Sequence, residues 1–189
     1  MKKLTLVLGA LVMTFMLSSC TNKKDAVIKI FNTFFDKEVA SLNEVTNADQ
    51  FLDFLTASDG RFEELYTMLD KDYPINENDE FIGFTQDESE AAMKVYNDRM
   101  EAFEILKESK GAELFEPYVT KFEDVVNGLV DDLLNERVVD ENIVDEIQAS
   151  YDDIDKYFAL GSEEQVDRLY EVDDMVSVLF GDNEEAEEE

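Results

Sequence analysis

The sequence predicts an all-α protein: a single antiparallel helical bundle or an α-hairpin array of about six or seven helices. Three observations support this prediction. Apolar residues recur at spacings of three and four along most of the chain, which is the period of an amphipathic helix. The 189 residues include only seven glycines and two prolines. Few stretches alternate apolar and polar residues, as a half-buried strand would.

The first two helices are separated by a short connection. One is expected over residues 25–42, with five apolar residues on one face, and Asn47 is a suitable N-cap for the next. The second helix is expected to be interrupted at Asp59-Gly60, after which its apolar stripe resumes. Residues 72–84 make the one long loop. The apolar faces consist of Val27, Phe31, Phe34, Phe35 and Leu42, then Phe51, Leu52, Leu55, Phe62, Leu65, Tyr66 and Leu69.

The middle of the chain predicts two helices separated at Gly111. Thr85-Gln86-Asp87-Glu88 has the pattern of a capping box, in which a hydroxyl and a carboxylate satisfy free backbone amides. The helix beyond Gly111 has the widest apolar stripe, which indicates neighbours on two sides and a central position. Gly128 in this helix marks either a close helix–helix approach or a tolerated glycine. The stripe contains Phe115, Tyr118, Val119, Phe122, Val125, Val126, Leu129, Val130, Leu133 and Leu134.

Two further helices complete the prediction. The first of them ends at Gly161, and Ser162-Glu163-Glu164-Gln165 is a second capping box that opens the last helix. We expect that helix to end at Gly181. Residues 182–189 are nearly all acidic and are expected to be disordered, because like charges repel and nothing apolar is available to bury. The apolar residues are Ile143, Ile147, Tyr151, Ile154 and Phe158, then Val166, Leu169, Val176 and Leu179.

The N-terminus has the pattern of a secretory signal. Met1-Lys2-Lys3 is positively charged, and residues 4–17 form a largely apolar run of the length found in signal peptides. The run is too short for a membrane span, which needs about 20 residues. It is followed by Leu17-Ser18-Ser19-Cys20, which resembles the lipobox of bacterial lipoproteins. The resemblance implies that Cys20 carries a diacylglycerol, that cleavage makes it the first mature residue, and that its amino group is usually acylated.

The same resemblance predicts the organisation and location of the protein. Residues 1–19 would be the signal peptide, 20–24 a short tether and 25–181 an acidic helical domain. Two or three acyl chains anchor a protein stably, since each buried methylene contributes about 0.8 kcal/mol. Thr21 follows the cysteine, where the inner-membrane retention pattern of enteric bacteria has aspartate, so the outer membrane is favoured. Lys23-Lys24-Asp25 is only loosely similar to a surface-display motif, so periplasmic and external placement both stay open.

The charge of the chain restricts its partners. The sequence has 47 acidic and 16 basic residues and a net charge of −31. Because 44% of the residues are hydrophobic and 14 are phenylalanine, the composition is not that of a disordered chain, and the charge is expected on the surface of a folded body. That surface would repel nucleic acid and anionic membranes. Basic proteins, cations and cationic peptides are the expected partners, and solubility alone is the alternative interpretation.

Most enzyme chemistry is disfavoured by residues that the sequence lacks. Without histidine there is no triad of the usual kind, hardly any zinc site, and no Glu-x-x-His motif for a di-iron bundle. No phosphate-binding glycine loop or dinucleotide motif occurs, and no cofactor is predicted. Paired carboxylates could bind calcium or act as acid and base, but they fall on the polar sides of the stripes. They are Asp131-Asp132, Asp152-Asp153, Asp155, Glu163-Glu164 and Asp173-Asp174.

The long loop contains the remaining candidates. Its calcium candidates lack the spacing of an EF-hand loop; they are Asn76, Asn78, Asp79 and Glu80. Phe81, Ile82 and Phe84 follow directly and either anchor a partner or fold back to cap the core of the bundle.

These observations predict a non-enzymatic, lipid-anchored envelope protein that binds a basic protein through its acidic surface, with the 72–84 loop as a candidate anchor. An immunity protein that neutralises a basic toxin is a special case. The alternative is a divalent-cation-binding protein or a carboxylate-based hydrolase. A purely structural role in the envelope is the residual interpretation.

The cation alternative makes a direct prediction. Micromolar to low millimolar calcium or magnesium should raise the melting temperature by mass action if a specific site exists. Monovalent salt at matched ionic strength is the required control, because general screening of a charge of −31 also stabilises the chain. A shift no larger than that of the control would contradict the cation site.

Overall fold

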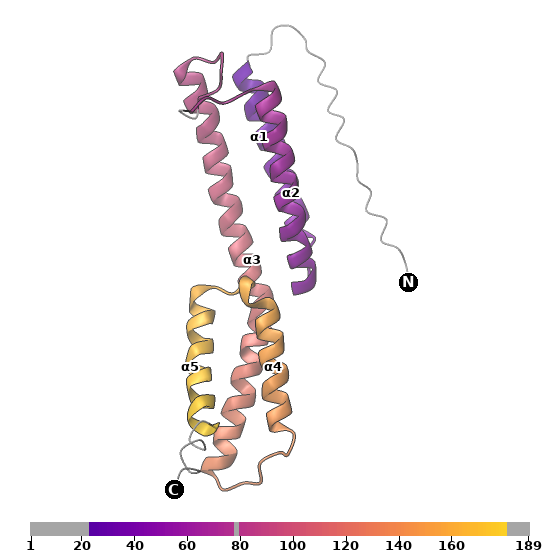
Figure 1. Cartoon of the computed structure of the whole chain (residues 1–189), viewed down its shortest axis with the longest axis vertical. Coiled ribbons are helices and arrows are strands. Elements are labelled where there is room, and N and C mark those ends of the chain that lie inside the picture. Colours follow the sequence, from indigo (N-terminus) through magenta and orange to yellow (C-terminus); the bar gives the residue numbers. More distant parts are fainter. Residues whose placement is uncertain (1–22, 78–79, 181–189) are drawn as a thin grey trace, which may run out of the picture.

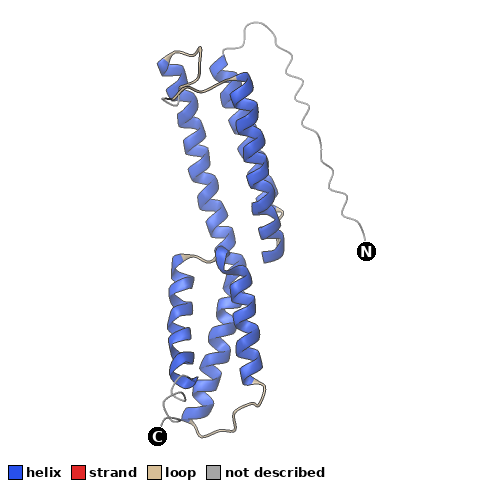
Figure 2. Cartoon of the chain, in the orientation of Figure 1, coloured by secondary structure: helices blue, strands red, loops and turns tan. Residues whose placement is uncertain are grey.

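The computed structural model describes residues 23–77 and 80–180, which form five α-helices, one short 3-10 helix and their connections (Figures 1 and 2). The all-α prediction is confirmed, and the expected number of helices was slightly too high. In the described part of the chain, the isolated antiparallel bridge between Ile75 and Phe81 is the only β-type pairing. The predicted signal peptide, Cys20, Asn78, Asp79 and the acidic tail lie outside the described residues.

The longest helix, α3 (Gln86–Leu134), is shared by two three-helix bundles. α1 (Lys23–Asn43) and α2 (Ala48–Asp72) pack on its N-terminal half, and α4 (Ile143–Tyr157) and α5 (Glu163–Phe180) pack on its C-terminal half (Figure 1). We call residues 23–110 the N-terminal bundle and residues 111–180 the C-terminal bundle. The 49 residues of α3 span roughly 73 Å at about 1.5 Å per residue, so the molecule is a rod.

α2 and α3 begin at their predicted caps, whereas α1 begins two residues earlier than predicted. α1 starts at Lys23, so the last two residues of the predicted tether are helical. The Asn47 side chain accepts a hydrogen bond from the amide of Gln50 at 3.0 Å and caps α2. At α3, the Thr85 amide donates to the carboxylate of Glu88 at 2.9 Å and the Glu88 amide donates to the Thr85 hydroxyl at 3.3 Å. The predicted capping box is therefore formed.

Phenylalanine fills the core of the N-terminal bundle. Phe35 is 1% exposed, and its ring lies 5.4 Å from that of Phe34, 5.8 Å from Tyr96, 6.0 Å from Phe62 and 6.2 Å from Phe103. Each such pair stabilises by about 0.5–1.5 kcal/mol beyond its burial. A second cluster of buried residues lies toward the start of α1; it contains Val27, Ile30, Phe31, Leu65, Leu69, Phe81 and Ala92.

The core of the C-terminal bundle is built on the widest stripe of α3. That stripe steps by three and four, and α4 and α5 pack on it from two sides (Figure 1), so the predicted central position is confirmed. The buried residues of α3 here are Phe115, Val119, Phe122, Val126 and Leu129, and their partners are Ile147, Ile154, Leu169 and Val172.

Two glycines that predicted breaks lie inside continuous helices. α2 runs through Asp59-Gly60, and α3 runs through Gly111. Gly60 is exposed, and a Cβ there would meet nothing within 4 Å, so it costs only helix propensity. Gly111 is buried in the apolar stripe between Phe103 and Phe115, and packing on both sides maintains the helix.

Gly111 marks the joint between the two bundles. The short helix η1 (Phe158–Leu160) crosses α3 here, and a Cβ on Gly111 would lie 2.9 Å from the Leu160 carbonyl oxygen and 3.4 Å from a ring carbon of Phe51. A Cβ on Gly161, which follows η1, would lie equally close, at 2.9 Å, to a ring carbon of Phe115. Only glycine permits this backbone approach. The predicted end of the preceding helix at Gly161 is confirmed, because α4 and η1 stop there.

Pro117 lies inside α3, six residues beyond the joint. It has no amide hydrogen for the carbonyl of Glu113, a change that costs about 3 kcal/mol or more in a helix interior. Both residues are exposed, so water can reach the carbonyl.

Among the described residues, no helix is both long enough and apolar enough to cross a membrane.

The joint yields a prediction with an internal control. Gly111→Ala should lower the free energy of unfolding by about 1–2 kcal/mol, because the clash with the Leu160 carbonyl outweighs the gain in helix propensity. Gly128→Ala in the same helix meets nothing within 4 Å and should raise it by up to about 1 kcal/mol. Urea denaturation measures both, and equal effects would contradict this role of Gly111.

Candidate functional site

The long loop places its three apolar candidates in different surroundings. Phe81 is 2% exposed, and its amide donates to the Ser89 hydroxyl at 2.6 Å. Its ring lies 5.1 Å from Phe84, which is half-buried, and 6.4 Å from Phe31 in the core. Ile82 is 58% exposed. Phe81 is therefore a core residue and not an exposed anchor, and the loop folds back over the bundle as the alternative interpretation expected.

The calcium candidates in this loop include two described residues. The Asn76 side chain donates to the Glu80 carboxylate and accepts from the Glu80 amide, both at 3.0 Å. The Glu80 carboxylate and the Asn76 amide oxygen therefore accept hydrogen bonds from within the same loop. Across residues 23–77 and 80–180, no group of three or more histidine, cysteine, aspartate or glutamate residues is arranged to hold a metal ion.

The acidic doublets lie on the surface, as predicted. Asp152, Asp155, Glu163 and Glu164 are exposed. Asp132 pairs locally with Arg137, just beyond the end of α3, at 3.5 Å. Two of the others connect helices: Lys121 on α3 pairs with Asp153 on α4 at 3.1 Å, and the Tyr151 hydroxyl on α4 donates to Asp173 on α5. Burial and this hydrogen bond raise the pKa of Tyr151 above its ordinary value of 10.0.

The two bundles differ in charge. Residues 111–180 contain 20 acidic and four basic residues, whereas the described residues of the N-terminal bundle contain 20 acidic and ten basic residues. Each base of the C-terminal bundle forms an ion pair with a carboxylate of this chain; these bases are Lys121, Arg137, Lys156 and Arg168. No base in this bundle is left to balance the remaining surface acids. Its surface is therefore the more negative of the two.

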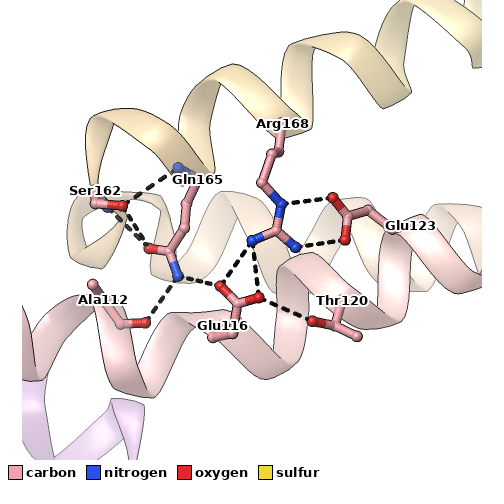
Figure 3. A network of polar contacts seen from close by, with 7 residues as sticks. All are labelled: Ala112, Glu116, Thr120, Glu123, Ser162, Gln165 and Arg168. Atoms are coloured by element: carbon pink, nitrogen blue, oxygen red, sulfur yellow. Dashed lines mark hydrogen bonds and ion pairs between the residues drawn. The ribbon is translucent and has the colours of Figure 1, made fainter.

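Arg168 on α5 connects two carboxylates of α3 (Figure 3). Its Nε and Nη2 donate to the two oxygens of Glu123 at 2.8 and 2.6 Å, and its Nη1 donates to Glu116 at 2.9 and 3.1 Å. Such bidentate, charge-assisted bonds are roughly twice as strong as neutral ones. They hold α5 in register on α3.

Gln165 connects the start of α5 to the same network (Figure 3). Its Oε1 accepts from the amide and hydroxyl of Ser162 at 3.0 and 3.3 Å, which completes the predicted capping box. Its Nε2 donates to the Ala112 carbonyl at 2.9 Å and to Glu116 at 2.7 Å. Glutamate could cap the helix, but only the amide can also donate to α3.

The network sets the ionisation of Glu116. The hydrogen bond from Gln165 and the bonds and charge of Arg168 hold the pKa of this carboxyl below its ordinary value of 4.5. The hydrogen bonds from Arg168 to Glu123 and to Glu116 raise the pKa of Arg168. Because the folded state favours ionised Glu116, its contribution to stability is complete above pH 4.5 and is lost as the pH falls through the lowered pKa.

A second charged contact bridges the two bundles across the joint. The Tyr157 hydroxyl donates to Asp49 at 2.9 Å, and the Lys156 ammonium lies 2.8 Å from the same carboxylate oxygen. Asp49 is in the first turn of α2, where the helix dipole favours a negative charge. These hydrogen bonds, that from Lys156 first, hold its pKa below its ordinary value of 3.8.

Only one acidic side chain of the described residues is buried. Glu38 on α1 is 1% exposed and accepts from Ser58 at 2.7 Å and from Arg61 Nη2 at 2.9 Å, and Arg61 Nε donates to its other oxygen. This pair lies at a groove of about 340 Å³ between α1 and α2. The other lining residues are Ile30, Thr33, Phe34, Lys37, Glu64, Leu65 and Met68.

None of these three charged contacts, the Arg168 network, the Asp49 contact and the Glu38–Arg61 pair, is among the predictions from the sequence. A signal exists for Glu38, because this acid occupies an apolar-stripe position between Phe35 and Leu42. Arg168 gives no comparable signal, since its partners lie 45 and 52 residues away.

No protein-family model matches the chain, and no curated protein or solved structure matches it either. The features of the described residues that could bind a partner are the surface carboxylates, the ion pairs that connect helices, and the groove between α1 and α2.

The network predicts a stability difference between two arginines. Arg168→Met should lower the free energy of unfolding by about 1–2 kcal/mol, because Glu116 and Glu123 lose charged hydrogen bonds on a partly buried face. Arg137→Met removes a more exposed pair and should cost at most about 0.5–1 kcal/mol.

Urea denaturation across pH supplies the second part of this test. The parent chain should lose stability as the pH falls below 4.5, and Arg168→Met should lose less over that range, because the Gln165 bond alone then holds the pKa of Glu116 down. Identical pH dependence in both chains would contradict the assignment.

Proposed function

We propose that this chain is a non-enzymatic binding module of the bacterial cell envelope, anchored by lipid on Cys20, which holds a basic protein through its acidic surface. One observation carries the proposal: of the acidic side chains in residues 23–77 and 80–180, only Glu38 is buried. All the other carboxylates lie at least partly at the surface, over a core that contains almost no charge. Such a surface attracts basic proteins and accelerates their association.

The C-terminal bundle is the strongest part of this surface. It has 20 acidic residues against four basic ones, and all four bases are paired with its own carboxylates or with Asp49. A basic partner therefore meets little competing positive charge there.

The anchor and the module are adjacent in the sequence. Only Thr21 and Asn22 separate Cys20 from the start of α1 at Lys23. Outer-membrane placement remains the proposed location, supported by Thr21 after the cysteine. Within residues 23–77 and 80–180, no arrangement of side chains favours the cation-binding or hydrolase alternative.

The binding proposal is tested by capturing partners from cells. Crosslinking of the full chain in living cells, followed by affinity purification and mass spectrometry, should recover one dominant basic protein. The affinity of the purified complex should fall steeply between low and high salt, because contacts between exposed charges are screened. An affinity that is independent of salt would exclude the acidic surface as the binding determinant.

The anchor has a separate test. Cys20→Ser should abolish incorporation of labelled palmitate and move the chain out of the membrane fraction, because the lipidated sulfur is lost. Ser19→Ala is the matched control, since it keeps a small residue before the cysteine and should stay lipidated. Unchanged palmitate labelling in Cys20→Ser would exclude this residue as the attachment site.

A further inference from the structure

Exposed apolar side chains gather at one end of the molecule. α3 ends, α4 begins and α5 ends at the same end of the C-terminal bundle, opposite the end where α1 begins (Figure 1). We call residues 131–146 and 174–180 the distal tip. Six of the 13 large, exposed hydrophobic side chains in the described part of the chain lie on it: Leu133, Leu134, Val138, Val144, Val178 and Phe180.

The most exposed of these residues are far outside the core. Val138 is 95% exposed, Leu134 is 76% exposed and Val178 is 74% exposed. Val138 belongs to the connection between α3 and α4, where polar residues are the usual choice. Grouped apolar residues of this kind, surrounded by polar ones, mark interaction sites. The described residues leave this end of the bundle uncovered.

The surroundings of the apolar residues are acidic. Arg137 is the only base of the distal tip, and it pairs with Asp132. No lysine or arginine occurs between Arg137 and Lys156 or after Arg168. The exposed acids are Asp131, Glu136, Asp140, Glu141, Asp145, Glu146 and Asp174.

We propose that the distal tip docks a cationic amphipathic segment of the partner protein, with the apolar side of the segment on the exposed leucines, valines and phenylalanine and its lysines or arginines against the surrounding carboxylates. This inference rests on the proposed function and assigns its binding site. Charge complementarity selects the occupant. A second copy of a chain with a net charge of −31 and an anionic membrane are both repelled.

The test uses the full chain in neutral detergent and a fluorescent helical peptide of leucine and lysine as the probe. Fluorescence anisotropy should show binding that weakens as sodium chloride rises from about 50 to about 500 mM. A peptide with serine in place of leucine should bind much more weakly, because it retains the charge and loses the apolar face.

Matched variants separate the tip from the rest of the surface. Leu134→Ser with Val138→Ser should lower peptide affinity at least about tenfold, as expected for central apolar contacts. Ile105→Ser with Leu106→Ser is the control, because these residues are 59% and 47% exposed and lie on the N-terminal half of α3, away from the tip. It should leave the affinity unchanged. Both pairs are on the surface, so circular dichroism should show the same helix content in each.

Each other outcome is decisive. Equal affinity in the tip and control variants, with strong salt dependence, would overturn the tip assignment and leave the proposed function standing. No binding of the peptide at low salt would contradict both. Concentration-dependent dimers that disappear in Leu134→Ser with Val138→Ser would assign the tip to a second copy instead.

Discussion

The close contact between η1 and α3 at Gly111 determines how the two halves of this protein are joined. A Cβ at this position would lie only 2.9 Å from the Leu160 carbonyl oxygen. The crossing therefore requires a glycine inside a helix that continues on both sides. The crossing directs the chain past Gly161 into α5. Arg168 is then opposite Glu116 and Glu123, and the α4 end of the same crossing is within reach of Asp49.

The excess of acid is compatible with this fold because the core and the surface are separated. Aromatic and branched side chains fill both bundles, and Glu38 is the one acid of the described residues that enters a core. Removing Arg61, which is itself 35% exposed, would leave the carboxylate of Glu38 buried without its charged partner, a change of the kind that costs about 3–5 kcal/mol. In the C-terminal bundle three of the four bases, Lys121, Lys156 and Arg168, connect helices, and Arg137 pairs locally with Asp132, so the positive charge is used within the fold and the outer surface stays negative.

Local features of the fold were predictable, and features that depend on opposing elements were not. Asn47, Thr85 and Ser162 cap helices through residues only three positions away, and spacing reveals such contacts. Gly60 faces solvent and Gly111 faces Leu160, but the sequence shows only a glycine at each position. The predicted helix break is wrong at both. Phe81 is buried and the next residue, Ile82, is exposed, and the partners of Arg168 lie on another helix. Neither arrangement can be predicted from the local sequence.

The length of α3 makes the protein a spacer as well as a binding surface. Its 49 residues separate the distal tip from the start of α1 by roughly 73 Å, whereas the Debye length at physiological ionic strength is about 8 Å. About nine screening lengths therefore lie between the two ends. The electric field of the tip does not reach whatever surrounds Lys23, so a negatively charged layer at that end would neither repel the tip nor weaken its hold on a cationic partner.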